Sequence, residues 1–288
     1  MSTQITLPGS RRIRHKTSGQ EHGPITRLMS PGNLGQLVKP FVFLDLFSAP
    51  AAFAGQMPVH PHSGIATVTV LTEGDFRFDD PVSGSGTLGY GGVEWMRAGG
   101  GVWHGKEMSI GEASHVTGFQ LWLALPPELE NGPVDSQYLE ASAMPVTGPA
   151  TVILGEYEGK ASPVRSPAGI TYLMVTLTPG QGWTYAPPAE QDVAWLAVSQ
   201  GALEGDNSVR RGEMAIFEGA GGVALQASSD GATFVIASAI AHPFDLVTGN
   251  YSVHTNRAAL AEGEGRIAEL RTRLPTQQAS GPTPVFGG

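Results

Sequence analysis

The fold of this chain is decided by the stretch His60-Pro61-His62-Ser63-Gly64-Ile65-Ala66-Thr67-Val68-Thr69-Val70-Leu71-Thr72-Glu73-Gly74. The β-branched and apolar residues that follow the two histidines are typical of a strand. Because side chains alternate along a strand with a period of two, His60 and His62 are expected to point to the same face. The stretch therefore brings two potential metal ligands together without a helix.

A third histidine follows a glycine cluster, in the segment Gly99-Gly100-Gly101-Val102-Trp103-His104-Gly105-Lys106-Glu107-Met108. Glycine permits a turn and a close approach of the backbone. If this segment pairs beside the first, His60, His62 and His104 share a pocket with the carboxylate of Glu107. A lone histidine in a strand is more often an ordinary polar residue. The gathering of three of the chain's eight histidines in glycine-bounded β-structure nevertheless favours metal ligation.

The composition indicates a β-rich globular protein. The 288 residues include 39 glycines and 22 prolines, and hydrophobic residues make up 41%, which is too many for a disordered chain. Short segments of alternating or β-branched residues are separated by turn residues, a pattern typical of a barrel or sandwich. The strands predicted in the first half are 67–71, 74–78, 86–90, 93–96 and 119–123.

The second half repeats this rhythm with different residues, and a chain of this length favours two domains. Its predicted strands are 151–155, 170–177, 193–198, 213–217, 223–226 and 233–237. No histidine stands between His115 and His242, so a second imidazole-based metal site is not expected. Near the end, an Asn256 cap and apolar residues at helical spacing predict one helix over 256–270.

Charge and composition exclude several classes of protein. The formal net charge of −9 opposes direct binding to nucleic acid, which needs clustered basic residues. The chain has no cysteine and therefore no disulfide or thiolate metal site. It has no apolar run long enough for a membrane span and no signal-like segment at Met1, so we expect a cytoplasmic protein without a membrane partner.

The sequence resembles the pirin family of the cupin superfamily in several motifs. They are His60-Pro61-His62 with Gly64 and Thr67-Val68-Thr69, then 92–104 (GVEWMRAGGGVWH), 118–126 (GFQLWLALP), 40–45 (PFVFLD) and 155–159 (GEYEG). The resemblance is specific from about Leu34 to Val164. It implies an all-β fold of two cupin-type antiparallel β-barrels, a bicupin, with a mononuclear iron site in the N-terminal barrel.

We accordingly expect two domains and a short C-terminal helix. Residues 1–133 would form the N-terminal metal-binding cupin domain, together with an N-terminal arm. Residues 134–288 would form a metal-free C-terminal cupin domain, together with a linker, the helix and a tail over 277–288.

The chain departs from the family pattern in two places. Where the family usually carries Arg, Phe and Glu, this chain has Ser63, Ile65 and Ala66, so a charged pair near the site is missing. One residue is also inserted between the third histidine and Glu107, which on a regular strand would turn Glu107 to the opposite face. A bulge at Gly105 would restore its direction. We therefore predict Glu107 as the fourth ligand, with water or Glu112 as the alternatives.

Two functions from different classes fit these features. The first is an oxygenase: the resemblance implies flavonol 2,3-dioxygenase (quercetinase) activity for some relatives. The ligand set suits a divalent first-row metal, with Fe²⁺ preferred and Zn, Mn, Ni or Cu as alternatives. Its partners would be a small aromatic substrate and dioxygen, and Glu107 would accept a proton.

The second function is a redox-sensing regulatory protein that binds a protein partner without catalysis, as the resemblance also implies. The iron's oxidation state would then change the affinity for that partner. A purely structural zinc site is a third interpretation, although such sites are usually closed and rich in cysteine.

Overall fold

The computed structural model describes residues 10–56, 58–80, 82–105, 107–274 and 285–286. It divides into two compact units. We call Gln20–Met144 with His242–Gly288 the histidine unit, and Met1–Gly19 with Pro145–Ala241 the second unit. Within the described residues, no helix has the length and apolarity that crossing a membrane requires.

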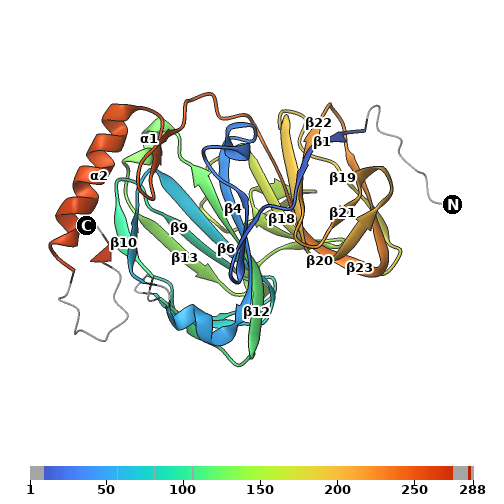
Figure 1. The fold of residues 1–288 in the computed structure, drawn as a ribbon, viewed down its shortest axis with the longest axis horizontal. Coiled ribbons are helices and arrows are strands. Elements are labelled where there is room, and N and C mark those ends of the chain that lie inside the picture. The colour runs from blue at the N-terminus through green and yellow to red at the C-terminus, as the bar shows by residue number, and fades with distance from the viewer. Residues whose placement is uncertain (1–9, 57, 81, 106, 275–284, 287–288) are drawn as a thin grey trace. The chain divides into compact units, whose positions relative to one another are not determined.

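The histidine unit is built on a seven-stranded antiparallel sheet with the strand order β13-β9-β6-β12-β4-β3-β2 (Figure 1). Its strands are β2 (Gln20–His22), β3 (Ile25–Met29), β4 (Phe41–Pro50), β6 (Ile65–Glu73), β9 (Val93–Arg97), β12 (His115–Ala124) and β13 (Asp135–Leu139). Three smaller sheets complete the unit: β5 (His60–His62), β10 (Val102–His104) and β26 (Val285–Phe286); β7 (Phe76–Asp80), β8 (Gly84–Leu88) and β11 (Met108–Ile110); β24 (Val247–Thr248) and β25 (Val253–His254).

The second unit is built on a nine-stranded sheet whose main path is β1-β22-β20-β23-β18-β15-β14, with β19 on β23 and β21 on β20. Its strands are β1 (Arg12–Thr17), β14 (Val146–Thr147), β15 (Ala150–Leu154), β18 (Ile170–Leu177), β19 (Gly182–Tyr185), β20 (Val193–Glu204), β21 (Val209–Arg210), β22 (Met214–Glu218) and β23 (Val223–Ala239), and a separate hairpin of β16 (Glu156–Tyr157) and β17 (Lys160–Ala161). Its alternating apolar residues pack into one cluster that includes Leu173, Tyr185, Leu196, Phe234 and Ile236.

Helices are few and short. The α-helices are α1 (Pro127–Glu130) and α2 (Arg257–Arg271), and the 3-10 helices are η1 (Leu34–Gln36), η2 (Ala51–Gln56), η3 (Ala141–Ala143) and η4 (Gly205–Asn207). The predicted C-terminal helix is confirmed as α2, and the Asn256 side chain caps it by accepting a hydrogen bond from the Ala259 N–H. Figure 1 shows α2 lying beside β10.

The two compact units differ from the predicted division at residue 133, because the histidine unit runs on to Met144 and includes 242–288, while residues 1–19 belong to the second unit. β1 of the N-terminal arm pairs antiparallel with β22, in the second unit. Helix α2 belongs to the histidine unit, where the backbone carbonyl of Ile267 accepts a hydrogen bond from the Trp103 indole N–H at 2.9 Å. The positions of β1 and α2 both depend on contacts between residues far apart in the chain. Within the predicted tail, 277–284 and 287–288 lie outside the described residues.

One polar row crosses the main sheet of the histidine unit. Arg27 lies opposite Asp45, Asp45 opposite Gln120, Gln120 opposite Thr69, and Thr69 opposite Glu94. Residues directly opposite on neighbouring strands share a face, so these five side chains line the same side of the sheet. Polar side chains at such positions lower the stability of the fold unless they form hydrogen bonds or ion pairs. Their presence here indicates that this face of the sheet carries a binding or catalytic site.

Candidate metal centre

The three predicted histidines converge because β5 and β10 pair antiparallel. His104 lies directly opposite His60, and Val102 lies opposite His62. The ring centroids of the three imidazoles are 4.5 to 5.1 Å apart, and one nitrogen from each ring can be chosen so that all three lie within 4.8 Å of one another. The pairing of the two histidine segments, which the predicted cluster requires, is therefore present.

Hydrogen bonds to backbone carbonyls orient two of the rings. His60 Nδ1 donates to the Pro58 carbonyl at 2.9 Å, and His62 Nδ1 donates to the Tyr251 carbonyl at 3.0 Å. The proton on Nδ1 leaves the lone pair on Nε2, which is how proteins prepare histidines for metal binding. His104 Nε2 is buried and has no hydrogen-bond partner in the described part of the chain. The donor set therefore fits a divalent transition-metal ion.

Burial keeps these imidazoles neutral. It lowers the pKa of His62 to about 3, with the neighbouring His60 acting in the same direction. Burial also lowers the pKa of His60, and it lowers that of His104 well below its ordinary value. Neutral imidazole is the form that binds metals, so no proton has to leave the cluster before an ion enters at pH 7.

Glu107 turns back toward the cluster after the inserted residue. Gly105 has a φ of +130°, and its N–H donates to Glu107 Oε2 at 2.8 Å. The carboxylate is buried, with Oε2 3.9 Å from His104 Nδ1. Glu107 therefore lies on the Nδ1 side of His104, and it is not part of the three-histidine group. Glu112, the alternative ligand, is exposed and lies 3.8 Å from Arg77 instead.

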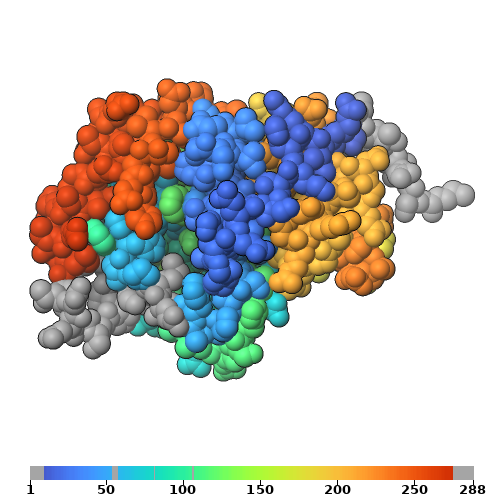
Figure 2. Space-filling model, in the orientation of Figure 1, coloured from blue at the N-terminus to red at the C-terminus, as the bar shows by residue number. Residues whose placement is uncertain are grey.

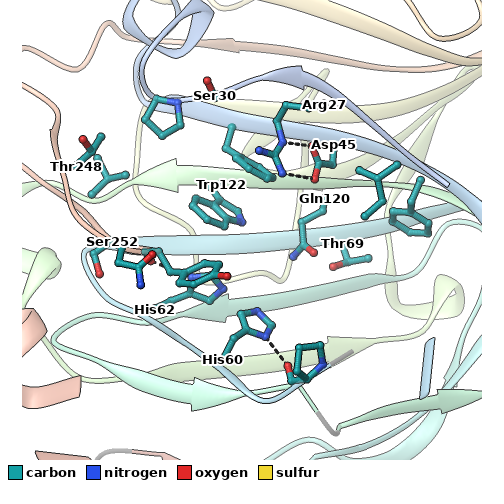
Figure 3. A pocket seen from close by; sticks show the side chains of 18 of the residues that line it. Arg27, Ser30, Asp45, His60, His62, Thr69, Gln120, Trp122, Thr248 and Ser252 are labelled. Carbon is teal, nitrogen blue, oxygen red and sulfur yellow. Dashed lines mark hydrogen bonds and ion pairs between the residues drawn. The ribbon is translucent and has the colours of Figure 1, made fainter. Parts of the chain in front are cut away.

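His60 and His62 open onto a cavity of about 630 Å³. Figure 2 shows the surface hollowed here, between the blue segments near the N-terminus and the orange-red segment 248–253. His60 and His62 line one side of the cavity, and Arg27 and Asp45 line another (Figure 3). A cavity of this size falls within the usual range for small-molecule sites.

Stacked rings form one wall of the cavity. The Phe43 and Trp122 rings lie 4.1 Å apart with an angle of 13° between their planes, and the Arg27 guanidinium lies 4.1 Å from the Phe43 ring centroid. The edge of His62 meets Trp122, with ring centroids 4.9 Å apart. This aromatic wall reaches a candidate metal ligand, His62.

The polar row forms the floor of the cavity. Arg27 makes an ion pair with Asp45, and burial raises the pKa of Asp45 although that ion pair opposes the shift. Gln120 and Thr69 also line the cavity, and Figure 3 shows the Gln120 amide between the Arg27–Asp45 pair and the histidines. These side chains can hydrogen-bond polar substituents on a ligand.

Two further features of the site were not predicted from the sequence. Glu94 is buried, accepts a hydrogen bond from the Thr69 hydroxyl at 2.6 Å, and has a pKa that burial raises to about 7. The signal was an acid inside an otherwise apolar strand. The second feature is a buried contact chain from Ser63 through His254 to Glu130. No local pattern could have found it, because its members lie far apart in the chain.

Comparison with known proteins agrees with this geometry. A family model described as Pirin matches residues 24–123. A pirin-like protein of Caulobacter vibrioides is 33% identical over 223 residues, which cover 74% of this chain and 80% of that protein. A Vibrio cholerae protein named "Putative quercetin 2,3-dioxygenase" is 33% identical over 190 residues, covering 62% of this chain and 67% of that protein.

Two solved structures share the bicupin fold. A quercetin 2,3-dioxygenase from Acinetobacter baumannii superposes with a TM-score of 0.73 at 23% identity, covering 92% of this chain and 97% of that one. A bacterial pirin from Escherichia coli in complex with nickel(II) superposes with a TM-score of 0.59 at 16% identity, covering 81% and 98%. At these identities the likeness shows the fold alone.

Proposed function

Because this chain belongs to the Pirin family, we propose that its histidine unit is a mononuclear non-haem metal site that oxidises a flavonol with dioxygen. His60, His62 and His104 would hold one divalent ion, Fe²⁺ in the first instance, and Glu107, whose Oε2 lies 3.9 Å from His104 Nδ1, would become the fourth ligand by turning its carboxylate toward the ion. The observation that carries the proposal is the convergence of three imidazoles, that of His62 buried and those of His60 and His104 partly buried, at the edge of an aromatic-walled cavity.

The cavity favours a flat, hydroxylated aromatic substrate. The aromatic wall of Phe43 and Trp122 would contact its rings edge to face, because Phe43 itself lies between Trp122 and the Arg27 guanidinium. Gln120 and Thr69 would bind its hydroxyl groups from the floor. The names of relatives in Vibrio cholerae and Acinetobacter baumannii support a flavonol such as quercetin.

Glu107 is the proposed proton acceptor. Flavonol oxidation begins with loss of a hydroxyl proton, and a buried carboxylate beside the ligands can receive it. When bound, the metal ion would supply Lewis acidity and redox chemistry at the edge of the cavity. The stacked wall and the polar floor would hold the substrate in one orientation, which lowers the entropic barrier to reaction.

The test is aerobic turnover by protein reconstituted with Fe²⁺. One flavonol and one dioxygen should give one ring-opened ester and one carbon monoxide. We expect the flavonol absorbance to fall and carbon monoxide to form, and His62→Ala should abolish both. Unchanged absorbance with no carbon monoxide, in protein shown to contain the metal, would contradict catalysis and favour the regulatory alternative.

A further inference from the structure

A buried chain of polar contacts runs behind the candidate metal centre. Ser63 Oγ lies 2.9 Å from His254 Nε2, and His254 Nδ1 donates to Glu130 Oε2 at 3.2 Å. The exposed fractions of the three residues are 0%, 1% and 3%. Glu130 also accepts hydrogen bonds from the backbone N–H and the hydroxyl of Thr255, both at 2.7 Å, so its carboxylate is well held. A buried polar chain of this kind is stable only when its members are partnered.

The order serine, histidine, glutamate is that of a nucleophilic triad, but Ser63 cannot act as a nucleophile here. Helix α2 seals it, because a Cβ built on Gly263 would lie 2.7 Å from both Ser63 Oγ and His254 Nε2. No space remains beside the hydroxyl for the carbonyl group of a substrate, and a nucleophile must reach its target. The chain of contacts must therefore act by holding other groups in place.

The group that it holds is the segment 251–254. The Ser63 and Ser252 hydroxyl oxygens lie 2.9 Å apart, the backbones of these two residues form a parallel bridge, and the Val253 N–H donates to the Ser63 carbonyl at 3.3 Å. His254 ends this segment, fastened to Ser63 and Glu130. The contacts thus tie a segment near the C-terminus to the residue next to His62.

Tyr251 connects this segment to the metal centre. Its carbonyl accepts the hydrogen bond from His62 Nδ1, and its ring centroid lies 6.1 Å from that of His62. Its φ is +67°, in the left-handed region that a tyrosine rarely adopts. Such a conformation persists only where the surroundings enforce it, and the contacts of Ser63 and His254 lie immediately after it in the chain.

We propose that Ser63, His254 and Glu130 are positioning residues that hold the Tyr251 carbonyl against His62 and so set the affinity of the three-histidine site for divalent ions. The inference rests on the proposed function, because it requires the histidines to bind a metal. It also accounts for one departure from the family pattern: the small side chain of Ser63 permits the close approach of Gly263.

The first test compares Ni²⁺ affinity in wild type, Ser63→Ala and Glu130→Gln, by competition with a chelator. Loss of an interaction that orients a ligand typically costs 10- to 100-fold in metal affinity, so we expect about a tenfold loss in each variant. The visible absorption of the Co²⁺ forms should also shift, because His62 would sit differently. Leu270→Ala is the control for stability, since it removes a buried side chain of α2 seven residues beyond Gly263; it should lower the melting temperature and leave the Ni²⁺ affinity within about twofold.

A matched pair in α2 provides the second test. Gly263→Ala places a methyl group against Ser63 and His254, whereas Gly265→Ala meets no atom within 4 Å. Both changes favour the helix locally. We expect Gly263→Ala to weaken Ni²⁺ binding and Gly265→Ala to leave it unchanged.

Three outcomes would overturn the inference. They are Ni²⁺ affinities within twofold of wild type in both Ser63→Ala and Gly263→Ala, an equal loss of affinity in Leu270→Ala, and equal effects of the two glycine substitutions. Failure of the wild type to bind Ni²⁺ would contradict the proposed metal site itself, and the inference with it, so the two failures are distinguishable.

Discussion

Large apolar side chains pack into one cluster in the second unit, whereas one face of the main sheet of the histidine unit borders a cavity that His60 and His62 line. In the second unit, Phe234 and Tyr185 belong to one buried apolar cluster. In the histidine unit, the polar row from Arg27 to Glu94 occupies the face of the main sheet that borders the cavity. Both units use antiparallel sheets, so the architecture alone does not decide which one carries a site.

The second unit has a hollow of its own, of about 720 Å³, but its chemistry differs. Residues drawn from 155–171 and 186–191 line it, and that part of the sequence contains no histidine. Apolar side chains that pack inside such a unit stabilise it. Polar side chains that border an open cavity can bind a ligand, but they lower the stability of the fold. Each prediction below tests that contrast.

The largest expected effect is the cost of removing a ring from the filled interior. Phe234 is fully buried, so Phe234→Ala should lower the free energy of unfolding by about 3–5 kcal/mol, through lost burial and a new cavity. Gln120 already faces an open cavity, and Gln120→Ala should cost less than about 1 kcal/mol. Urea denaturation of both variants measures this difference. Equal costs would show that the two interiors do not differ as described.

The next prediction concerns the cost of the buried acid in the histidine unit. Burial raises the pKa of Glu94 to about 7, above its value in the unfolded chain. The folded state therefore favours the protonated carboxyl group. The stability that this group contributes is fully present below about pH 4.5, and it is lost as the pH rises through 7 and the buried carboxyl group ionises. Glu94→Gln should match wild type at pH 4.5 and exceed it at pH 8 by on the order of 2–3 kcal/mol.

The measurement is urea denaturation of metal-free protein across that range of pH. Parallel pH profiles for wild type and Glu94→Gln would mean that the carboxyl group does not carry this cost.

A smaller effect, on metal affinity, is expected at Glu107, which one inserted residue separates from its usual position in the family pattern. If its carboxylate completes the ligand set, Glu107→Gln should weaken metal binding about tenfold, because the variant keeps the shape and removes the charge. Glu112→Gln is the matched control, since Glu112 lies just beyond β11, five residues further along the chain, and is exposed beside Arg77. Chelator competition measures both affinities. An unchanged value for Glu107→Gln would leave three histidines and water as the ligand set.

Much of the histidine cluster could be predicted from local sequence. The period of a strand brought His60 and His62 to one face, and the glycines around His104 allowed β10 to pair with β5. The same local rules located α2 through its Asn256 cap. Such features follow from residues that are neighbours in the chain.

The rest of the site depends on contacts that no local pattern encodes. The carbonyl that orients His62 belongs to Tyr251, and the partner of Ser63 is His254, each separated from it by most of the chain. The assignment of the N-terminal arm to the second unit has the same origin, since β1 pairs with β22, about 200 residues further along the chain. Contacts between distant parts of the chain determine where these residues lie, and the composition of each segment does not predict such contacts.

The central claim, that the histidine unit binds a divalent metal through His60, His62 and His104, is tested most directly by metal content. Wild type, His62→Ala and the control His115→Ala would be loaded anaerobically with Fe²⁺, desalted and analysed for iron. His115 is a suitable control because its ring lies outside the cluster and contacts Ser48 at 3.0 Å. We predict about one ion per chain in wild type and in His115→Ala, and almost none in His62→Ala. Stoichiometric iron in His62→Ala would contradict the account.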